Sequence, residues 1–407
     1  QPYEISLVTQ STTGVTTRVS IASDGGQSTH SSYEPSISAD GRYVAFASEA
    51  PNLVPNDTNE KVDIFVHDQI TGSTSRVSVA SDGTQANDSS ARPAISADGR
   101  YVAFWSYASN LVPGDTSSSK WDVFVHDRMA GTTIRVSVAN NGESGNGASA
   151  YPSISANGRY VAFYSSANNL VPNDTNQRTD IFIHDLITGT TSRVSVDSNG
   201  AQANGQSLYP SISADGRYVA FSSSASNLVL NDTNGKPDIF VHDLVGGATT
   251  RVSVTSDGTQ ANGDLLTIAI SADGRYVTFP SSASNLVPND TNESQDIFVH
   301  DLVTGITSRI SVNSDGGEGN SISRFPSISA DGRYISFSSF ATNLIIGDTN
   351  QKEDIFVHDR TTGKTTRVSV SSNGEQGDGT ASTPWISIDG RYIALWSTSN
   401  NLVPDDT

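Results

Sequence analysis

Apolar and polar residues alternate along short segments of the chain, and turn residues separate these segments. RYVAFAS at 42–48 and TSRVSV at 74–79 alternate, and DIFVHD at 63–68 is rich in β-branched and aromatic residues. Together with PSIS at 35–38 these segments predict four short strands, named a to d in chain order. ADG at 39–41 predicts a tight turn with glycine at the position that needs a positive φ. No segment combines helical spacing with helix caps, so we predict an all-β protein.

The four-strand unit recurs seven times. DGRY begins at Asp40, Asp98, Asp215, Asp273, Asp331 and Asp389, and NGRY begins at Asn157, with spacings of 58 or 59 residues. The arginine of RVSV and its variants follows the same period, at Arg18, Arg76, Arg135, Arg193, Arg251, Arg309 and Arg367. Such a period indicates a repeat architecture in which each unit packs only on its neighbours.

Seven four-stranded units predict a seven-bladed β-propeller with antiparallel blades, forming a single domain over residues 1–407. The chain opens with segments of type c and d and closes with segments of type a and b. We therefore expect the seventh blade to combine about 380–407 with 1–20, two strands from each end. This arrangement would close the ring without a free sheet edge.

The run SxDGRYVAFSS, followed by DIFVHDxxTGxTxRVSV, resembles the WD40-like repeat (PD40) of TolB-type propellers. The resemblance covers essentially the whole chain and concerns only the propeller part of that family. It implies the propeller fold. Family members include periplasmic interaction modules and propellers that gate attached hydrolases, so the resemblance alone does not identify the partner.

The extra length of each repeat falls on one face of the predicted ring. The b–c loop covers about 48–62 and the d–a loop about 81–93, whereas the a–b and c–d turns are short. In an up-and-down blade the b–c and d–a loops emerge on the same face. We name this the loop face and expect function there, because loops on a rigid scaffold commonly carry it.

Acidic and amide residues recur in the b–c loop with the spacing D-x-N-x-x-x-D. Oxygen ligands alternating in a short loop suit a hard cation, so the sequence predicts a structural Ca²⁺ in each of blades 1 to 6. The match to an EF-hand loop is partial, since the central glycine and the distal glutamate are missing. The predicted ligands are Asp57, Asn59, Asp63, Asp115, Ser117, Asp122, Asp174, Asn176, Asp180, Asp232, Asn234, Asp238, Asp290, Asn292, Asp296, Asp348, Asn350 and Asp354.

A second interpretation of these loops needs no metal: Asp and Asn side chains form Asx-turns that satisfy the loop backbone. In the seventh blade Asp406 is followed only by Thr407, and we align Ile5, beside Glu4, with Asp63. A seventh site would then be defective.

A His-Asp pair ends strand c in six blades, as at His67 and Asp68. A catalytic pair is needed once, so we interpret six copies as a hydrogen-bonding element of the blade. The sequence contains no GxSxG, HExxH or P-loop motif. No residue is therefore predicted to be catalytic.

Aromatic residues distinguish the blades from one another. Predicted ligand-binding aromatics lie close to the loop face or in the channel: Trp105, Tyr107, Trp121, Tyr164, Phe340, Trp385 and Trp396. Tyr151, Tyr209 and Phe325 lie near them. Trp385 is expected to open strand a and to narrow the central channel near its mouth. Such rings suit a carbohydrate or protein contact; the alternative is that they pack between blades.

Charge and composition narrow the classes of partner. The formal net charge is -19 and there are only five lysines, which argues against nucleic acid. There are no cysteines and no apolar run long enough to span a membrane. The acidic, lysine-poor composition and the start at Gln1 without methionine lead us to expect a secreted, periplasmic or cell-surface monomer of bacterial type.

These patterns favour a non-enzymatic binding module that presents its acidic loop face to a protein or a carbohydrate. The alternative is a carbohydrate-active enzyme, a polysaccharide lyase or glycoside hydrolase, with its site at the channel mouth. A third possibility is a structural repeat from a larger surface protein.

Overall fold

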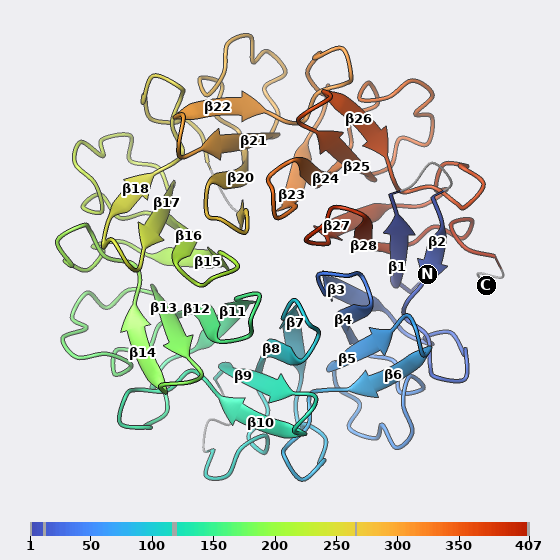
Figure 1. The fold of residues 1–407 in the computed structure, drawn as a ribbon, viewed down its shortest axis with the longest axis vertical. Coiled ribbons are helices and arrows are strands. Elements are labelled where there is room, and N and C mark those ends of the chain that lie inside the picture. The colour runs from blue at the N-terminus through green and yellow to red at the C-terminus, as the bar shows by residue number, and fades with distance from the viewer. Residues whose placement is uncertain (1, 11–13, 116–119, 265–266, 405–407) are drawn as a thin grey trace.

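Seven four-stranded sheets surround a central axis in the computed structural model (Figure 1). The structure describes residues 2–10, 14–115, 120–264 and 267–404. Within these ranges every regular element is a strand, and no helix could span a membrane. The architecture is a seven-bladed β-propeller, as the repeats predict.

Each sheet orders its strands a, b, c, d, and Figure 1 shows the a strands innermost. The a strands are β3 (Ser32–Ile37), β7 (Ser90–Ile95), β11 (Ser149–Ile154), β15 (Ser207–Ile212), β19 (Ala269–Ile270), β23 (Ser323–Ile328) and β27 (Ala381–Ile386). The b strands are β4 (Tyr43–Ser48), β8 (Tyr101–Ser106), β12 (Tyr160–Ser165), β16 (Tyr218–Ser223), β20 (Tyr276–Ser281), β24 (Tyr334–Ser339) and β28 (Tyr392–Ser397).

The c strands are β5 (Asp63–Asp68), β9 (Asp122–Asp127), β13 (Asp180–Asp185), β17 (Asp238–Asp243), β21 (Asp296–Asp301), β25 (Asp354–Asp359) and β1 (Glu4–Thr9). The d strands are β6 (Ser73–Arg76), β10 (Thr132–Arg135), β14 (Thr190–Arg193), β18 (Thr249–Arg251), β22 (Ile306–Arg309), β26 (Lys364–Arg367) and β2 (Thr16–Arg18). Blades 1 to 6 follow chain order from β3, and blade 7 comprises β27, β28, β1 and β2.

The last blade joins the two ends of the chain, as expected. Its sheet has the order β2-β1-β28-β27. The register corrects one alignment: Glu4 pairs with Ser397 as Asp63 pairs with Ser48, so Glu4, not Ile5, is the counterpart of Asp63. Ile5 is fully buried in the core instead.

Two predicted strand limits are wrong. The a strand begins three residues before PSIS, because two residues bulge out of the ladder between Tyr33 and Ser36 and pairing resumes beyond them. Trp385 is consequently the fifth residue of β27 and does not open it. The d strand ends at its arginine, so the d–a loop between blades 1 and 2 covers 77–89.

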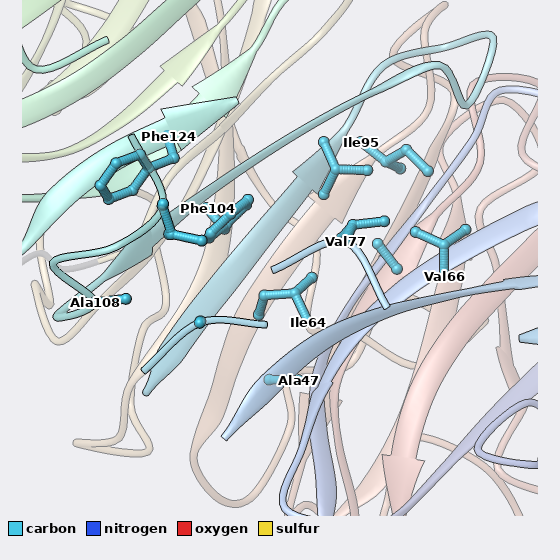
Figure 2. Close-up of a cluster of buried hydrophobic side chains, with 12 residues drawn as sticks. Ala47, Ile64, Val66, Val77, Ile95, Phe104, Ala108 and Phe124 are labelled. Carbon is cyan, nitrogen blue, oxygen red and sulfur yellow. The ribbon is translucent and has the colours of Figure 1, made fainter. Parts of the chain in front are cut away.

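The hydrophobic core lies between neighbouring blades. Figure 2 shows one such cluster, in which Ile64 and Val66 of blade 1 face Phe104 and Ile95 of blade 2. Within each of blades 1 to 6 two buried phenylalanines from strands b and c contact each other, as Phe46 and Phe65 do at 5.9 Å between ring centroids. The hydrophobic core is therefore made of clusters that each join two neighbouring blades.

The DGRY motif also joins blades. Gly99 has a φ of 73°, and a Cβ there would lie 2.1 Å from the ring of Tyr43 in the preceding blade. The tyrosine covers this glycine, and a side chain at position 99 would displace the ring. The contact recurs around the ring and includes Gly41 with Tyr392, where blade 1 follows blade 7.

Main-chain bonds between the a–b turns connect the inner ends of the blades. The Ala39 N–H donates to the Ala97 carbonyl (2.9 Å), and Ala97 donates to Ala156 (3.0 Å). This chain of bonds continues blade by blade to Ala330 and Ile388 (2.9 Å). The a strands are thus held together at the face opposite the loop face.

Candidate functional site

The repeated His-Asp pair stabilises the blade. His67 Nδ1 lies 2.8 Å from the Thr74 hydroxyl, which donates to the Ile21 carbonyl of the previous blade. Asp68 accepts two bonds from Arg42, from Nε at 2.9 Å and Nη2 at 2.7 Å, and this holds the pKa of the Asp68 carboxyl well below its usual range. These contacts agree with the structural interpretation of the pair.

The acidic b–c loop surrounds an arginine of strand d. Arg76 Nη1 lies 3.0 Å from Asp57 Oδ1 and 3.4 Å from Asp63 Oδ2. The Ser78 hydroxyl donates to Asp63 Oδ1 at 2.5 Å. Burial raises the pKa of Asp57 and of Asp63, and the nearby guanidinium acts in the opposite direction. The guanidinium is therefore the cation that these carboxylates face.

The side-chain amide of Asn59 in this loop is engaged in hydrogen bonds within the protein. Asn59 Oδ1 accepts from the Lys61 N–H (3.0 Å), and Asn59 Nδ2 donates to Asp63 Oδ2 (2.9 Å) and to the Ala86 carbonyl (3.0 Å). A Ca²⁺ ion needs oxygens, whereas an amide N–H points at the carboxylate here. As they lie, the three side chains do not fit Ca²⁺, and calcium binding stays a prediction.

The other blades repeat this arrangement with small variations. In blade 2, Arg135 binds Asp115 and Asp122, and Ser117 lies outside the described residues. Arginine–carboxylate pairs recur at Arg193 with Asp174 and Asp180, Arg251 with Asp232 and Asp238, Arg309 with Asp290 and Asp296, and Arg367 with Asp348 and Asp354. The Oδ1 atoms of Asn176, Asn234, Asn292 and Asn350 accept from backbone N–H groups, as that of Asn59 does.

Two blades depart from the common pattern. In blade 7 Glu4 pairs with Arg18 at 2.5 Å, so the carboxylate that the sequence alignment lacks is present; Asp406 lies outside the described residues. In blade 5 Glu318 joins Asp290 and Asp296, the one group among the described residues whose carboxylates are close enough to share a metal ion. Arg309 contacts all three carboxylates there.

Seven side chains of five residue types surround the mouth of the central channel. They occupy the third position of strand a or its equivalent, and we call them the rim residues: Glu34, Arg92, Tyr151, Tyr209, Thr267, Phe325 and Thr383. All line a channel of about 290 Å³. Strand a begins where the d–a loop ends, so the rim lies on the loop face.

The backbone of the rim is strained. Six of the seven rim residues have φ between 47° and 57°, although none of them is glycine. Each of the six precedes a proline, which normally favours an extended residue before it. Blade 5 has Ile268 in place of the proline. Left-handed non-glycine residues cost free energy and cluster at functional sites. The strain therefore makes the rim the candidate functional site.

One side of the rim forms a connected polar and aromatic cluster. Arg92 Nε lies 2.7 Å from Glu34 Oε1, and the guanidinium lies over the ring of Tyr151, 4.7 Å from its centroid. Tyr151 stacks on Tyr164 (5.3 Å) and meets Tyr209 edge-on (5.1 Å). Burial raises the pKa of Tyr164 to about 12.

Other predicted aromatics make ring contacts of their own. Trp105 stacks on Trp121 (5.1 Å), and Tyr107 meets both rings edge-on. Trp396 packs on Tyr3, with 4.6 Å between ring centroids. Trp105 and Trp396 also pack against the cores between blades. The predicted aromatics therefore form several groups and not one continuous patch.

Two predicted aromatics remain partly exposed. Trp385 lines the channel with 45% of its surface exposed, at a position where the other blades have Ser or Ala. Phe340 is 38% exposed and lies beside Arg324, whose guanidinium also approaches Phe325.

The sequence patterns single out none of Glu34, Arg92, Arg324 and Glu353. The available signal was alignment of the seven repeats at the third position of strand a, where the seven blades use five residue types. The bulge that aims this residue at the channel has no clear sequence signature, because a residue before proline is expected to be extended.

Known structures share the fold at low identity. Oligogalacturonate lyase in complex with manganese is 12% identical, with a TM-score of 0.52 over 98% of this chain and 97% of that one. The propeller domain of the Trilobed protease from Pyrococcus furiosus is also 12% identical, with a TM-score of 0.52 over 87% of this chain and 82% of that one. Both likenesses support the β-propeller fold alone.

TolB from Acinetobacter baumannii is 17% identical with a TM-score of 0.45; the match covers 88% of this chain but only 64% of that one. No protein-family model matches the chain, and no curated protein matches its sequence. The β-propeller class is thus established, and membership in the TolB-type repeat family stays a prediction.

Proposed function

We propose that this protein is a non-enzymatic binding module that takes a carbohydrate at the channel mouth on its loop face. One observation carries the proposal: the seven rim residues are of five types in blades whose scaffold is otherwise repeated, and six of them are held in a strained backbone conformation. Strain of this kind is retained where the surrounding structure fixes a useful side-chain position.

The chemistry of the rim supports a sugar ligand. Tyr151, Tyr209 and Phe325 offer ring faces, and Glu34 and Arg92 offer charged hydrogen-bonding groups around the same opening. Mostly apolar walls with a few convergent polar groups are typical of small-molecule sites. The acidic, lysine-poor composition favours a secreted or periplasmic location for this module.

A carbohydrate-active enzyme is the second candidate, because oligogalacturonate lyase has the same type of fold. The rim contains no histidine, and the six strand-c histidines are engaged with threonines of strand d. Release of reducing ends or unsaturated products from neutral and acidic polysaccharides would identify this activity.

Binding to a glycan array tests the main proposal. We compare wild-type protein with Tyr209→Ala at the rim and with Ile187→Ser, a control on the opposite face whose side chain is 74% exposed. We expect wild type and the control to bind the same glycans, and Tyr209→Ala to bind them about tenfold more weakly through loss of a ring contact.

If the protein binds isolated envelope proteins but no glycan, its partner is a protein and the carbohydrate proposal is wrong. No binding to either class would overturn the binding-module proposal.

A further inference from the structure

Blade 6 carries an ion pair at a place where three of the other blades carry an aromatic side chain. The residue after the core aromatic or leucine of strand b is Trp105 in blade 2, Tyr164 in blade 3 and Trp396 in blade 7, but Ser338 in blade 6. In blade 6 Arg324 of β23 and Glu353, just before β25, interact beside this serine.

Four hydrogen bonds hold the Glu353 carboxylate. Arg324 Nε donates to Oε1 and Nη2 donates to Oε2, each at 2.8 Å. The Ser338 hydroxyl (2.6 Å) and the Ser382 hydroxyl of blade 7 (3.1 Å) also donate to Oε1. Glu353 is only 1% exposed, so the arginine orientation is set from within the protein. An aromatic residue would fill this space without desolvating charges, so the pair calls for another explanation.

One edge of the Arg324 guanidinium remains available. A guanidinium has five N–H donors, and Glu353 uses one from Nε and one from Nη2. Nη1 and the second Nη2 proton form the other fork of the group. The side chain is 39% exposed, and its guanidinium carbon lies 5.1 Å from the ring centroid of Phe325 and 5.4 Å from that of Phe340.

Arg92, the arginine of the rim itself, also uses Nε and Nη2, but its partners lie nearer the surface. Its Nε binds Glu34, its Nη2 lies 3.4 Å from the Tyr151 hydroxyl, and its backbone N–H donates to Glu34. Glu34 also neutralises it at the rim surface. The side chain of Glu353 is only 1% exposed, against 22% for that of Glu34, so Arg324 is held from within the protein and not by a partner at the surface.

We propose that Arg324 binds the carboxylate of an acidic sugar, whose ring lies against Phe325 or Phe340. This inference rests on the proposed carbohydrate function and specifies the ligand class. A guanidinium fork matches a carboxylate in two parallel hydrogen bonds, and aromatic faces beside it suit the apolar face of a sugar ring. The net charge of -19 repels long polyanions, so the ligand is a short oligosaccharide with few uronic acid residues.

The test variant removes both partners of the ion pair. Arg324→Leu alone leaves Glu353 buried without its cation and is expected to unfold more easily. Arg324→Leu combined with Glu353→Gln removes both charges and uses residues that the repeat already accepts, since Leu208 and Gln295 occupy the equivalent positions in blades 4 and 5. Its melting temperature relative to wild type checks folding.

Titration calorimetry with short oligosaccharides ending in glucuronic or galacturonic acid, and with their neutral glucose or galactose counterparts, measures the preference. We expect wild type to bind the acidic members about 10- to 100-fold more tightly, as one charged hydrogen-bonded contact allows. The double variant should lose this preference and bind both members equally.

The outcomes separate the two proposals. Equal wild-type affinity for acidic and neutral sugars, or an acidic preference that survives in the double variant, overturns the role of Arg324 and leaves the carbohydrate proposal standing. Binding of peptide carboxylates without any sugar binding overturns both the sugar ligand and the carbohydrate proposal. No binding of any sugar in either series overturns the proposed function itself.

Discussion

Gly99 and Gly72 have nearly the same left-handed φ, 73° and 69°, but different surroundings. A Cβ on Gly99 would meet the ring of Tyr43, whereas a Cβ on Gly72 would have no atom within 4 Å. Both positions favour glycine because of their positive φ, but only Gly99 also lacks the space for a side chain.

We predict that Gly99→Ala lowers the free energy of unfolding by about 2–5 kcal/mol, the sum of the left-handed strain and the overpacking against Tyr43. Gly72→Ala, the matched control, should lose only about 1–2 kcal/mol. Denaturant unfolding of the two variants measures the difference. Equal losses would show that the Tyr43 ring moves aside at no cost.

At the residue scale, the role of a residue could be predicted from the sequence where that residue recurs in every repeat or nearly every repeat. The strand-c histidines could be interpreted as structural because six copies argue against a single catalytic centre. The arginines of RVSV could not be placed opposite the acidic loops, because the sequence does not give the register between strands d and c. Residues that occur once, such as Glu353, carry no repeat signal at all.

At the element scale, the b–c loop and strand d form one electrostatic unit in each blade. Arg76 supplies the positive charge that the sequence led us to assign to calcium. Five or six bound calcium ions per chain after dialysis against metal-free buffer would support the calcium hypothesis. With the guanidinium groups in place, we expect wild type to retain none.

Replacing the arginine tests this arrangement directly. Arg76→Gln leaves Asp57 and Asp63 facing each other without their cation, so we predict that millimolar Ca²⁺ raises its melting temperature. Binding only to the folded state stabilises it by mass action. Wild type should show no such shift. A shift of the same size in wild type would show that calcium and arginine bind the loop together.

At the scale of the whole molecule, six buried histidines act in the same direction on stability. Burial lowers the pKa of each below the ordinary 6.5, and the adjacent aspartate offsets this only in part. In blade 7 Val8 takes the equivalent position. Because the unfolded chain binds protons more readily, stability is fully present above about pH 6.5 and falls as pH drops through the folded pKa values.

We predict that the free energy of unfolding falls as pH drops below about 6.5, with net proton uptake on unfolding. Two acidic groups act differently: Asp68, whose pKa is lowered, loses its contribution only at more acidic pH, whereas Asp63, whose pKa is raised, opposes the histidines because the fold gains stability when it is protonated. Denaturant titrations across this range measure the effect. A flat profile would contradict the assignment of these histidines as buried and neutral.

The overall fold was accessible from sequence, because the 58-residue period and the phase of the termini leave few alternatives to a closed ring. The rim was not. Its geometry depends on a bulge between Tyr33 and Ser36, where long-range packing of the inner strands overrides the local preference of a residue before proline.

The strained rim has an evolutionary consequence. The backbone conformation at Glu34 and Tyr209 is the same although their side chains share no chemistry. The scaffold therefore fixes the backbone position from which a rim side chain extends, and the residue type decides only which chemical group it presents to a ligand. A single codon change can alter one seventh of the rim without disturbing a core, so duplicated copies of such a gene could diversify in ligand while conserving the ring.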